Sequence, residues 1–339
     1  MGCYKPLIRF YVPDNPEASG HIYTLRRFAI ERAKNPKLTY EDLIYRKDVM
    51  LIPCGQCIGC KIQKRQDWAT RIEMEAKTWP KESIWFVTLT YDNEHIPGVN
   101  HETGEVVRGA MYLRRKKEPE LAVNQTLWYE DIQNFLKRLR KAYRGQIRYF
   151  VAGEYGERTG RPHYHMILFG YQPEKLEPYS KVKPDEYKID SRITKCWGLG
   201  IHNLINPTQG GYSYVAGYVT KKFDDETLEH IKNGLRPPFA QMSRDPGLGY
   251  KYYQEHKDEI WKKGYIQLDN GKRASIPRYF QEMQRLEDPQ ILWELKKRNQ
   301  QRAIDKTKDM LGRTNVPYED YLKAKEQAVK KSRKAMGKI

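Results

Sequence analysis

Apolar residues recur along much of this chain with the two spacings that distinguish strands from helices. Runs rich in β-branched and aromatic residues predict strands at residues 84–91, 147–154, 163–169 and 197–205. Apolar positions at helical spacing predict helices at residues 61–79, 130–144 and 210–222. Strands and helices in this order are typical of an antiparallel-rich α+β fold.

The remaining segments are less regular. Residues 93–126 are polar and contain glycine, which predicts an inserted loop. Asp288 and Pro289 suit the first positions of a helix over residues 291–311. We expect three parts: a segment with a cysteine cluster at 1–62, a main domain at 63–225, and a mostly helical, basic region at 226–339.

Two histidines on one predicted strand are candidate metal ligands. In an extended strand, His163 and His165 point to the same face, together with Ile167 and Phe169. Glycines and a proline between the strands predict a hairpin loop, which would bring Glu154 beside the histidines. A carboxylate with two imidazoles suits Mg²⁺ or Mn²⁺, and Glu157 is an alternative to Glu154. For an isolated pair of histidines on a strand, an ordinary structural role is commoner than metal binding. His202 is likewise expected to be an ordinary strand histidine.

Tyrosines on the predicted helix at 210–222 are candidate nucleophiles. Tyr214 and Tyr218 are four residues apart and share a helical face, which Lys221 and Lys222 continue. A phenol beside ammonium groups suits attack on a phosphodiester. The alternative is an aromatic stripe that packs the helix against the sheet.

The charge of the chain narrows the classes of partner. It has 61 basic and 43 acidic residues, a net charge of +18, with 25 Tyr and 7 Trp. Cations interleaved with aromatic rings suit single-stranded nucleic acid, although ribosomal, capsid and RNA-binding proteins can also be this basic. No run approaches a transmembrane span and the first residues do not resemble a signal peptide, so a cytoplasmic location is expected.

Three cysteines occur at CxxCxxC spacing: Cys54, Cys57 and Cys60. In a reducing compartment this spacing indicates a metal site, and Cys3 is the natural fourth ligand of a structural zinc. An iron–sulfur cluster is the alternative metal site, and buried free thiols are a third reading.

These motifs together resemble the HUH endonuclease superfamily of rolling-circle replication initiators. The resemblance rests on His163-Tyr164-His165, on Tyr218 with Lys221, and on the strand FVTLTYD at 86–92. Within the superfamily, PCGQCIGC (53–60), AGEYGERTGRPHYH (152–165) and YVAGYVTKK (214–222) are most similar to the initiators of gokushovirus-type microviruses. The likeness covers most of residues 1–225 and none beyond.

The resemblance implies a central antiparallel sheet with the histidines on its face and the tyrosine helix across them. It implies an endonuclease and strand transferase that nicks single-stranded DNA at an origin, leaving a 5′-phosphotyrosine and a free 3′-hydroxyl, in the cytoplasm of a bacterial host. Whether a host helicase or polymerase takes part is left open. The alternatives are a non-enzymatic single-strand binding protein and a plasmid relaxase of the same superfamily.

Overall fold

The computed structural model describes residues 2–10, 22–23, 35–37, 42, 49–100, 103–109, 123–156, 159–179, 187–207, 209–217, 231–232, 234–269, 271–314 and 316–335. Contacts group the chain into two compact units. One consists of Met1–Lys64 with Asp258–Ile339, and the other of Arg65–Lys257. The three-part domain division expected from the sequence stays a prediction.

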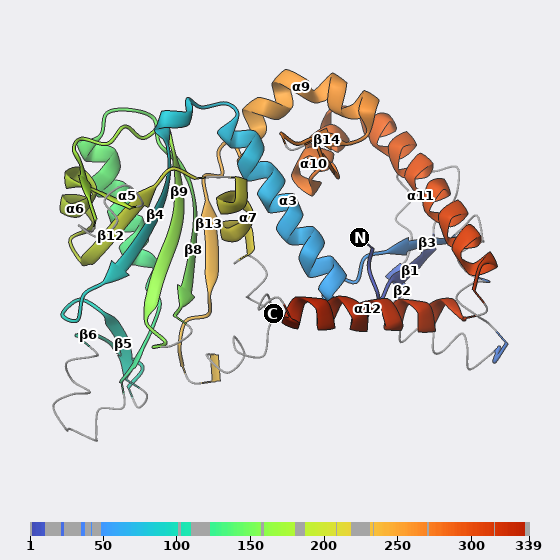
Figure 1. Ribbon diagram of the computed structural model, residues 1–339, viewed down its shortest axis with the longest axis horizontal. Helices are drawn as coiled ribbons and strands as arrows, with labels where there is room; N and C mark the ends of the chain where they lie inside the picture. The colour runs from blue at the N-terminus through green and yellow to red at the C-terminus, as the bar shows by residue number, and fades with distance from the viewer. Residues whose placement is uncertain are drawn as a thin grey trace. The chain divides into compact units, whose positions relative to one another are not determined.

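A seven-stranded sheet forms the centre of the Arg65–Lys257 unit (Figure 1). Its strand order is β10 (Leu176–Pro178), β11 (Lys188–Asp190), β12 (Gly200–Ile205), β4 (Ile84–Tyr91), β9 (Pro162–Phe169), β8 (Arg148–Tyr155) and β13 (Phe239–Met242). All neighbouring strands run antiparallel. The expected α+β fold with a central antiparallel sheet is therefore confirmed.

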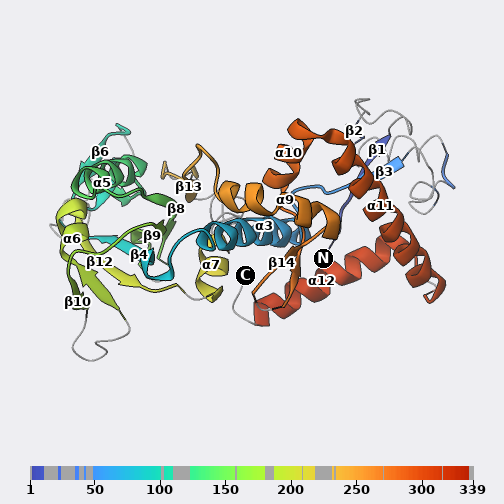
Figure 2. The same ribbon diagram turned by 90° about the horizontal axis from the view of Figure 1, so that it is seen from above.

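Helices cover both faces of this sheet (Figure 2). Against one face lie α5 (Tyr129–Ala142) and α6 (Ser191–Trp197), and the core there contains Tyr164, Met166 and Leu168 of β9. Against the other face lie α3 (Ile58–Ala76) and α7 (Gln209–Gly217), with Ile167 and Phe169 of β9. The alternation of side chains predicted for this strand is confirmed.

Two segments differ from the sequence expectation. The strand expected at 197–205 begins only at Gly200, because residues 191–197 form α6. The Asp190 carboxylate caps that helix and Gly198, with φ of 62°, ends it. The prediction of a loop at residues 93–126 is partly wrong. Within this segment, β5 (Pro97–Asn100), β6 (Val106–Arg108) and β7 (Val123–Gln125) form a small antiparallel sheet.

The other unit combines short strands with long helices. Strands β1 (Leu7–Phe10), β2 (Ile22–Tyr23) and β3 (Val49–Ile52) form one sheet, and β14 (Ile266–Gln267) pairs with β15 (Arg273–Ala274). Its helices include α10 (Arg278–Glu287), α11 (Pro289–Gly312) and α12 (Tyr318–Ala335), while α9 (Tyr250–Lys263) crosses from one unit to the other. The Asp288 carboxylate accepts a bond from the Gln290 amide, which confirms the expected start of α11. Among the described helices, none is both long and apolar enough to cross a membrane.

Candidate active site

The β8–β9 hairpin brings a carboxylate and two imidazoles to one end of the sheet. Its ladder places Glu154 directly opposite His163, and Ala152 opposite His165. Gly160, at φ of 62°, lies in the connecting loop, where a residue with a side chain would be strained. The hairpin inferred from the glycines and proline therefore exists, and its register puts the three side chains on the same face.

The three side chains converge on one small region. Glu154 Oε1 lies 3.0 Å from His163 Nε2 and 3.1 Å from His165 Nε2. The side chains are only 8%, 18% and 10% exposed for Glu154, His163 and His165 respectively. One carboxylate between two imidazoles is a donor set that suits a hard divalent cation such as Mg²⁺ or Mn²⁺.

The second nitrogen of each imidazole has its own partner. His163 Nδ1 lies 3.1 Å from the Arg161 carbonyl oxygen, so the ring donates its proton there. His165 Nδ1 lies 3.3 Å from Thr88 Oγ1 on the neighbouring strand β4. With these partners on Nδ1, the Nε2 atoms of both rings are directed at Glu154.

Strand β4 also supplies an aromatic side chain, Phe86, beside the histidines, and the sequence did not predict this contact. The Phe86 ring stacks on His165, with centroids 5.5 Å apart and an interplanar angle of 26°. The alternation of FVTLTYD already puts Phe86 and Thr88 on one face of the strand. What could not be read locally is that this face adjoins the histidines, because that follows from the β4–β9 register.

Helix α7 places one of the two candidate tyrosines against this cluster. Val215 and Ala216 are fully buried against the sheet, whereas Tyr214 is 50% exposed. The Tyr214 ring centroid lies 5.6 Å from that of His165 and 6.2 Å from that of Phe86. Tyr214 thus combines contact with the cluster and access to solvent. Tyr218, Lys221, Lys222 and the alternative ligand Glu157 lie outside the described residues.

A buried polar network supports the histidine strand from the opposite face. Tyr164 OH accepts a hydrogen bond from the Trp128 amide at 2.9 Å and lies 2.8 Å from Tyr91 OH. Tyr91 OH in turn donates to Asp131, whose carboxylate also binds Arg108. Burial raises the pKa of both phenols far above the ordinary value, so they stay neutral donors and acceptors. This explains why a tyrosine stands between the two histidines.

His202 lies on the other face of the sheet from the cluster. It is 4% exposed, and its Nε2 accepts a hydrogen bond from the Asp190 amide. Burial lowers the pKa of this imidazole to about 4. His202 is thus an ordinary strand histidine, as expected.

The cysteine cluster forms a second candidate metal centre, in the other unit. Cys3, Cys54, Cys57 and Cys60 place their four sulfur atoms within 4.8 Å of one another. The fifth cysteine, Cys196, is buried in α6 and belongs to neither cluster. The structure thus brings Cys3 to the CxxCxxC segment, as expected from the need for a fourth ligand.

Comparison with known proteins places these features in a family. The family described as "Replication-associated protein ORF2/G2P" matches residues 84–223, which contain all three members of the Glu/His/His cluster and Tyr214. No solved structure matches the chain.

Three phage proteins are similar to much of the chain. Replication-associated protein ORF2 of Spiroplasma virus 4 is 33% identical over 237 residues, covering 68% of this chain and 66% of the relative. Replication-associated protein ORF4 of Chlamydia phage 1 is 31% identical over 244 residues, 69% of this chain and 53% of the relative. Replication-associated protein VP4 of Bdellovibrio phage phiMH2K is 27% identical over 250 residues, 70% of this chain and 69% of the relative.

The chain therefore belongs to the family of replication-associated proteins found in microvirus-type phages. It spans less than two thirds of the length of the first two relatives.

Proposed function

We propose that this protein initiates replication of a phage genome by nicking single-stranded DNA at an origin and remaining covalently attached to it. The observation that carries the proposal is the position of Tyr214, whose half-exposed ring lies 5.6 Å from His165 of the Glu/His/His cluster. A phenol beside a donor set that suits a divalent cation is an arrangement that tyrosine-based transesterification at phosphorus can use. The phage relatives named for replication support the biological role.

Glu154, His163 and His165 would hold Mg²⁺ or Mn²⁺ through one carboxylate oxygen and two Nε2 atoms. When bound, the cation would polarise the scissile phosphate and offset the charge that develops there. The residues around the cluster position these ligands: Thr88 and the Arg161 carbonyl orient the imidazoles, and Phe86 covers one ring.

In the proposed reaction, the phenolic oxygen of Tyr214 or Tyr218 attacks the phosphorus atom. A tyrosyl oxygen–phosphorus bond forms while the bond from phosphorus to the 3′ oxygen breaks. The leaving oxygen takes the electron pair and gains a proton, which balances the proton lost by the phenol. The products are a 5′-phosphotyrosine and a free 3′-hydroxyl, and attack of a 3′-hydroxyl on the phosphotyrosine later rejoins the strand.

Two tyrosines allow two rounds of this transfer. One phenol would hold the displaced strand while the other cuts the regenerated origin. By their spacing from Tyr218, Lys221 and Lys222 are the candidates to contact the phosphate or to assist the proton transfer. The net charge of +18 fits a polyanionic partner, and we expect the protein to act inside the bacterial host.

The test is covalent attachment. The full chain is mixed with Mn²⁺ and labelled single-stranded fragments tiling the phage genome, and label that migrates with protein is measured after denaturation. We expect an adduct on one fragment, lost with EDTA and in the Tyr214→Phe/Tyr218→Phe double variant. Tyr212→Phe is the matched control, because Tyr212 lies on the same helix but packs into the core against the sheet.

The outcomes separate the proposal from its competitors. Tight binding to every fragment without any adduct would favour the non-enzymatic single-strand binding protein. An adduct that persists in the double variant would show that another residue is the nucleophile.

A further inference from the structure

The spacings of the four cysteine sulfurs suit a single tetrahedral metal ion. Cys3 Sγ lies 3.7 Å from Cys57 Sγ, and Cys54 Sγ lies 3.9 Å from Cys60 Sγ. A disulfide needs about 2.05 Å between its sulfurs, so these are not disulfides. Zn–S bonds of about 2.3 Å in a tetrahedral site place neighbouring sulfurs about 3.8 Å apart. All four sulfurs lie within 4.8 Å of one another, which fits one ion and leaves no room for a cluster of several irons.

Backbone amides donate hydrogen bonds to three of the four sulfurs. The Tyr4 amide donates to Cys57 Sγ, the Cys54 amide to Cys3 Sγ, and the Cys57 amide to Cys54 Sγ, at 3.3–3.4 Å. Amide donors partly offset the charge of a thiolate, and they orient each sulfur toward the centre of the cluster. Three of the four sulfurs therefore have an amide donor, and a set of four cysteine ligands is typical of closed, structural metal sites.

The segment that carries Cys3 is held very close to the start of α3. A Cβ atom at Gly59 would lie 2.3 Å from the Gly2 carbonyl oxygen and 2.9 Å from the Tyr4 ring. Only glycine permits Gly2 and Tyr4 to come this close to residue 59. Gly59, inside the CIGC segment, therefore lets the segment with Cys3 pack against the start of α3.

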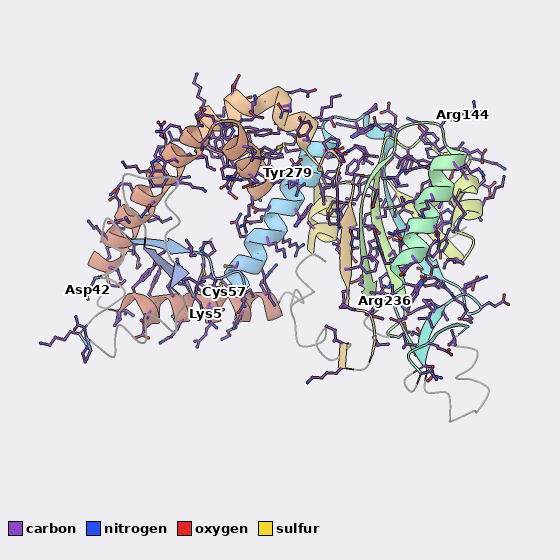
Figure 3. All side chains as sticks on the ribbon, turned by 180° about the vertical axis from the view of Figure 1, so that it is seen from behind. Lys5, Asp42, Cys57, Arg144, Arg236 and Tyr279 are labelled. Atoms are coloured by element: carbon purple, nitrogen blue, oxygen red, sulfur yellow. The ribbon has the colours of Figure 1, made fainter. Side chains whose placement is uncertain are left out.

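The same cluster contacts α12. Leu322 and Val329 pack against the core formed by Tyr4, Cys57 and Cys60, and Lys5 Nζ lies 3.9 Å from the buried carboxylate of Glu326. Figure 3 shows Lys5 and Cys57 side by side at the start of α3, next to α12. Helix α12 therefore packs against both the cysteines and the segment that carries Cys3.

We propose that Cys3, Cys54, Cys57 and Cys60 bind one structural Zn²⁺ ion, and that this ion fastens α12 to the cysteine segment. Binding exchanges the thiol protons for the metal and involves no redox step. Zinc is favoured over a lone iron because nitrogen and sulfur sites generally hold zinc more tightly than ferrous iron. The proposal does not depend on the nicking chemistry, since it concerns a separate cluster.

Metal identity is tested on the full chain carrying His163→Ala and His165→Ala, so that the other centre does not contribute metal. The protein is expressed with both zinc and iron in the medium, and metals and acid-labile sulfide are measured. We expect about one zinc per chain and no sulfide, with zinc lowered roughly tenfold or more in Cys57→Ser. Cys196→Ser, which removes the cysteine outside the cluster, should keep the zinc. Iron with sulfide, or a protein free of metal, would overturn the proposal.

Cobalt provides a second readout of the ligands. Replacing zinc by Co²⁺ should produce the intense sulfur-to-cobalt charge-transfer absorption of a thiolate site, retained in Cys196→Ser and weakened in Cys3→Ser. A spectrum unchanged in Cys3→Ser would show that Cys3 is not a ligand.

The role in docking α12 is tested by hydrogen exchange before and after zinc removal with a strong chelator. Amides of residues 318–335 and of residues 3–5 should lose protection together, while those of β4 keep theirs. Gly59→Ala should weaken zinc retention in the same way, whereas Gly312→Ala, where a Cβ meets no atom within 4 Å, should not. If α12 stays protected without zinc, the ion does not fasten it.

Discussion

Glu154 faces His163 across the β8–β9 ladder, and its Oε1 atom lies 3.0 Å from the Nε2 atom of that ring. The same oxygen lies 3.1 Å from His165 Nε2, so one carboxylate oxygen joins both imidazoles. Antiparallel pairing brings Glu154 to two histidines that lie nine and eleven positions further along the chain. The paired strands hold all three donors, and the carbonyl of Arg161 at the end of the loop orients the His163 ring.

Removing the charge of Glu154 should disable the cluster. Glu154→Gln keeps the shape of the side chain but replaces an anionic oxygen with a weaker ligand. We expect Mn²⁺ affinity to fall roughly 10- to 100-fold and DNA adduct formation to fall with it. Mn²⁺ titration followed by electron paramagnetic resonance measures the first effect, and adduct yield the second. If Glu157→Gln has the large effect and Glu154→Gln does not, Glu157 is the ligand.

Phe86 should act by holding the His165 ring in place. Phe86→Leu removes the stacked ring while keeping an apolar side chain, so we expect His165 to sample other orientations. Mn²⁺ affinity and adduct rate should each fall about tenfold. Phe135→Leu, in the core on the opposite face, is the control, and it should lower the melting temperature without changing Mn²⁺ affinity. Equal Mn²⁺ affinity in both variants would show that the Phe86 ring only packs.

The Tyr164 hydroxyl should contribute to stability rather than to chemistry. Tyr164→Phe leaves the partly buried Trp128 amide without its acceptor, which costs about 1 kcal/mol of unfolding free energy. Urea unfolding measures this loss. Adduct yield per folded molecule should stay within about twofold, since this hydroxyl is on the face of the sheet away from the cluster. A loss of adduct without a loss of stability would contradict this assignment.

His202 should make stability depend on pH in the acid range. Its pKa is lowered from 6.5 to about 4 in the folded protein because burial penalises the charged ring. At His202, the unfolded chain therefore binds a proton more readily than the folded protein does. The free energy of unfolding falls as pH drops from about 6.5 to about 4, and below pH 4 the loss due to His202 is constant. The full effect is about 3 kcal/mol.

The measurement compares wild type with His202→Gln, which retains an acceptor for the Asp190 amide but does not titrate. The difference in unfolding free energy between the two proteins should change over this pH interval and be level above it. A difference that is constant throughout would show that His202 is not the group responsible.

The sequence by itself determined the features that depend on local spacing. The alternation of β9 placed His163 and His165 on one face, the helical periodicity located α5, and CxxCxxC marked three converging sulfurs. These succeed because strand and helix geometry repeat every few residues, whatever the rest of the chain does. The order of strands and helices was likewise enough for the α+β class.

Only the tertiary structure decided which distant residues meet. The β4–β9 register brings Phe86 and Thr88 beside His165, and the packing of α7 sets Tyr214 against the same ring. The small sheet within residues 93–126 was also invisible, because its short strands are stabilised by one another rather than by a strong local pattern. In each case the deciding contacts join residues far apart in the chain, and no local periodicity carries that information.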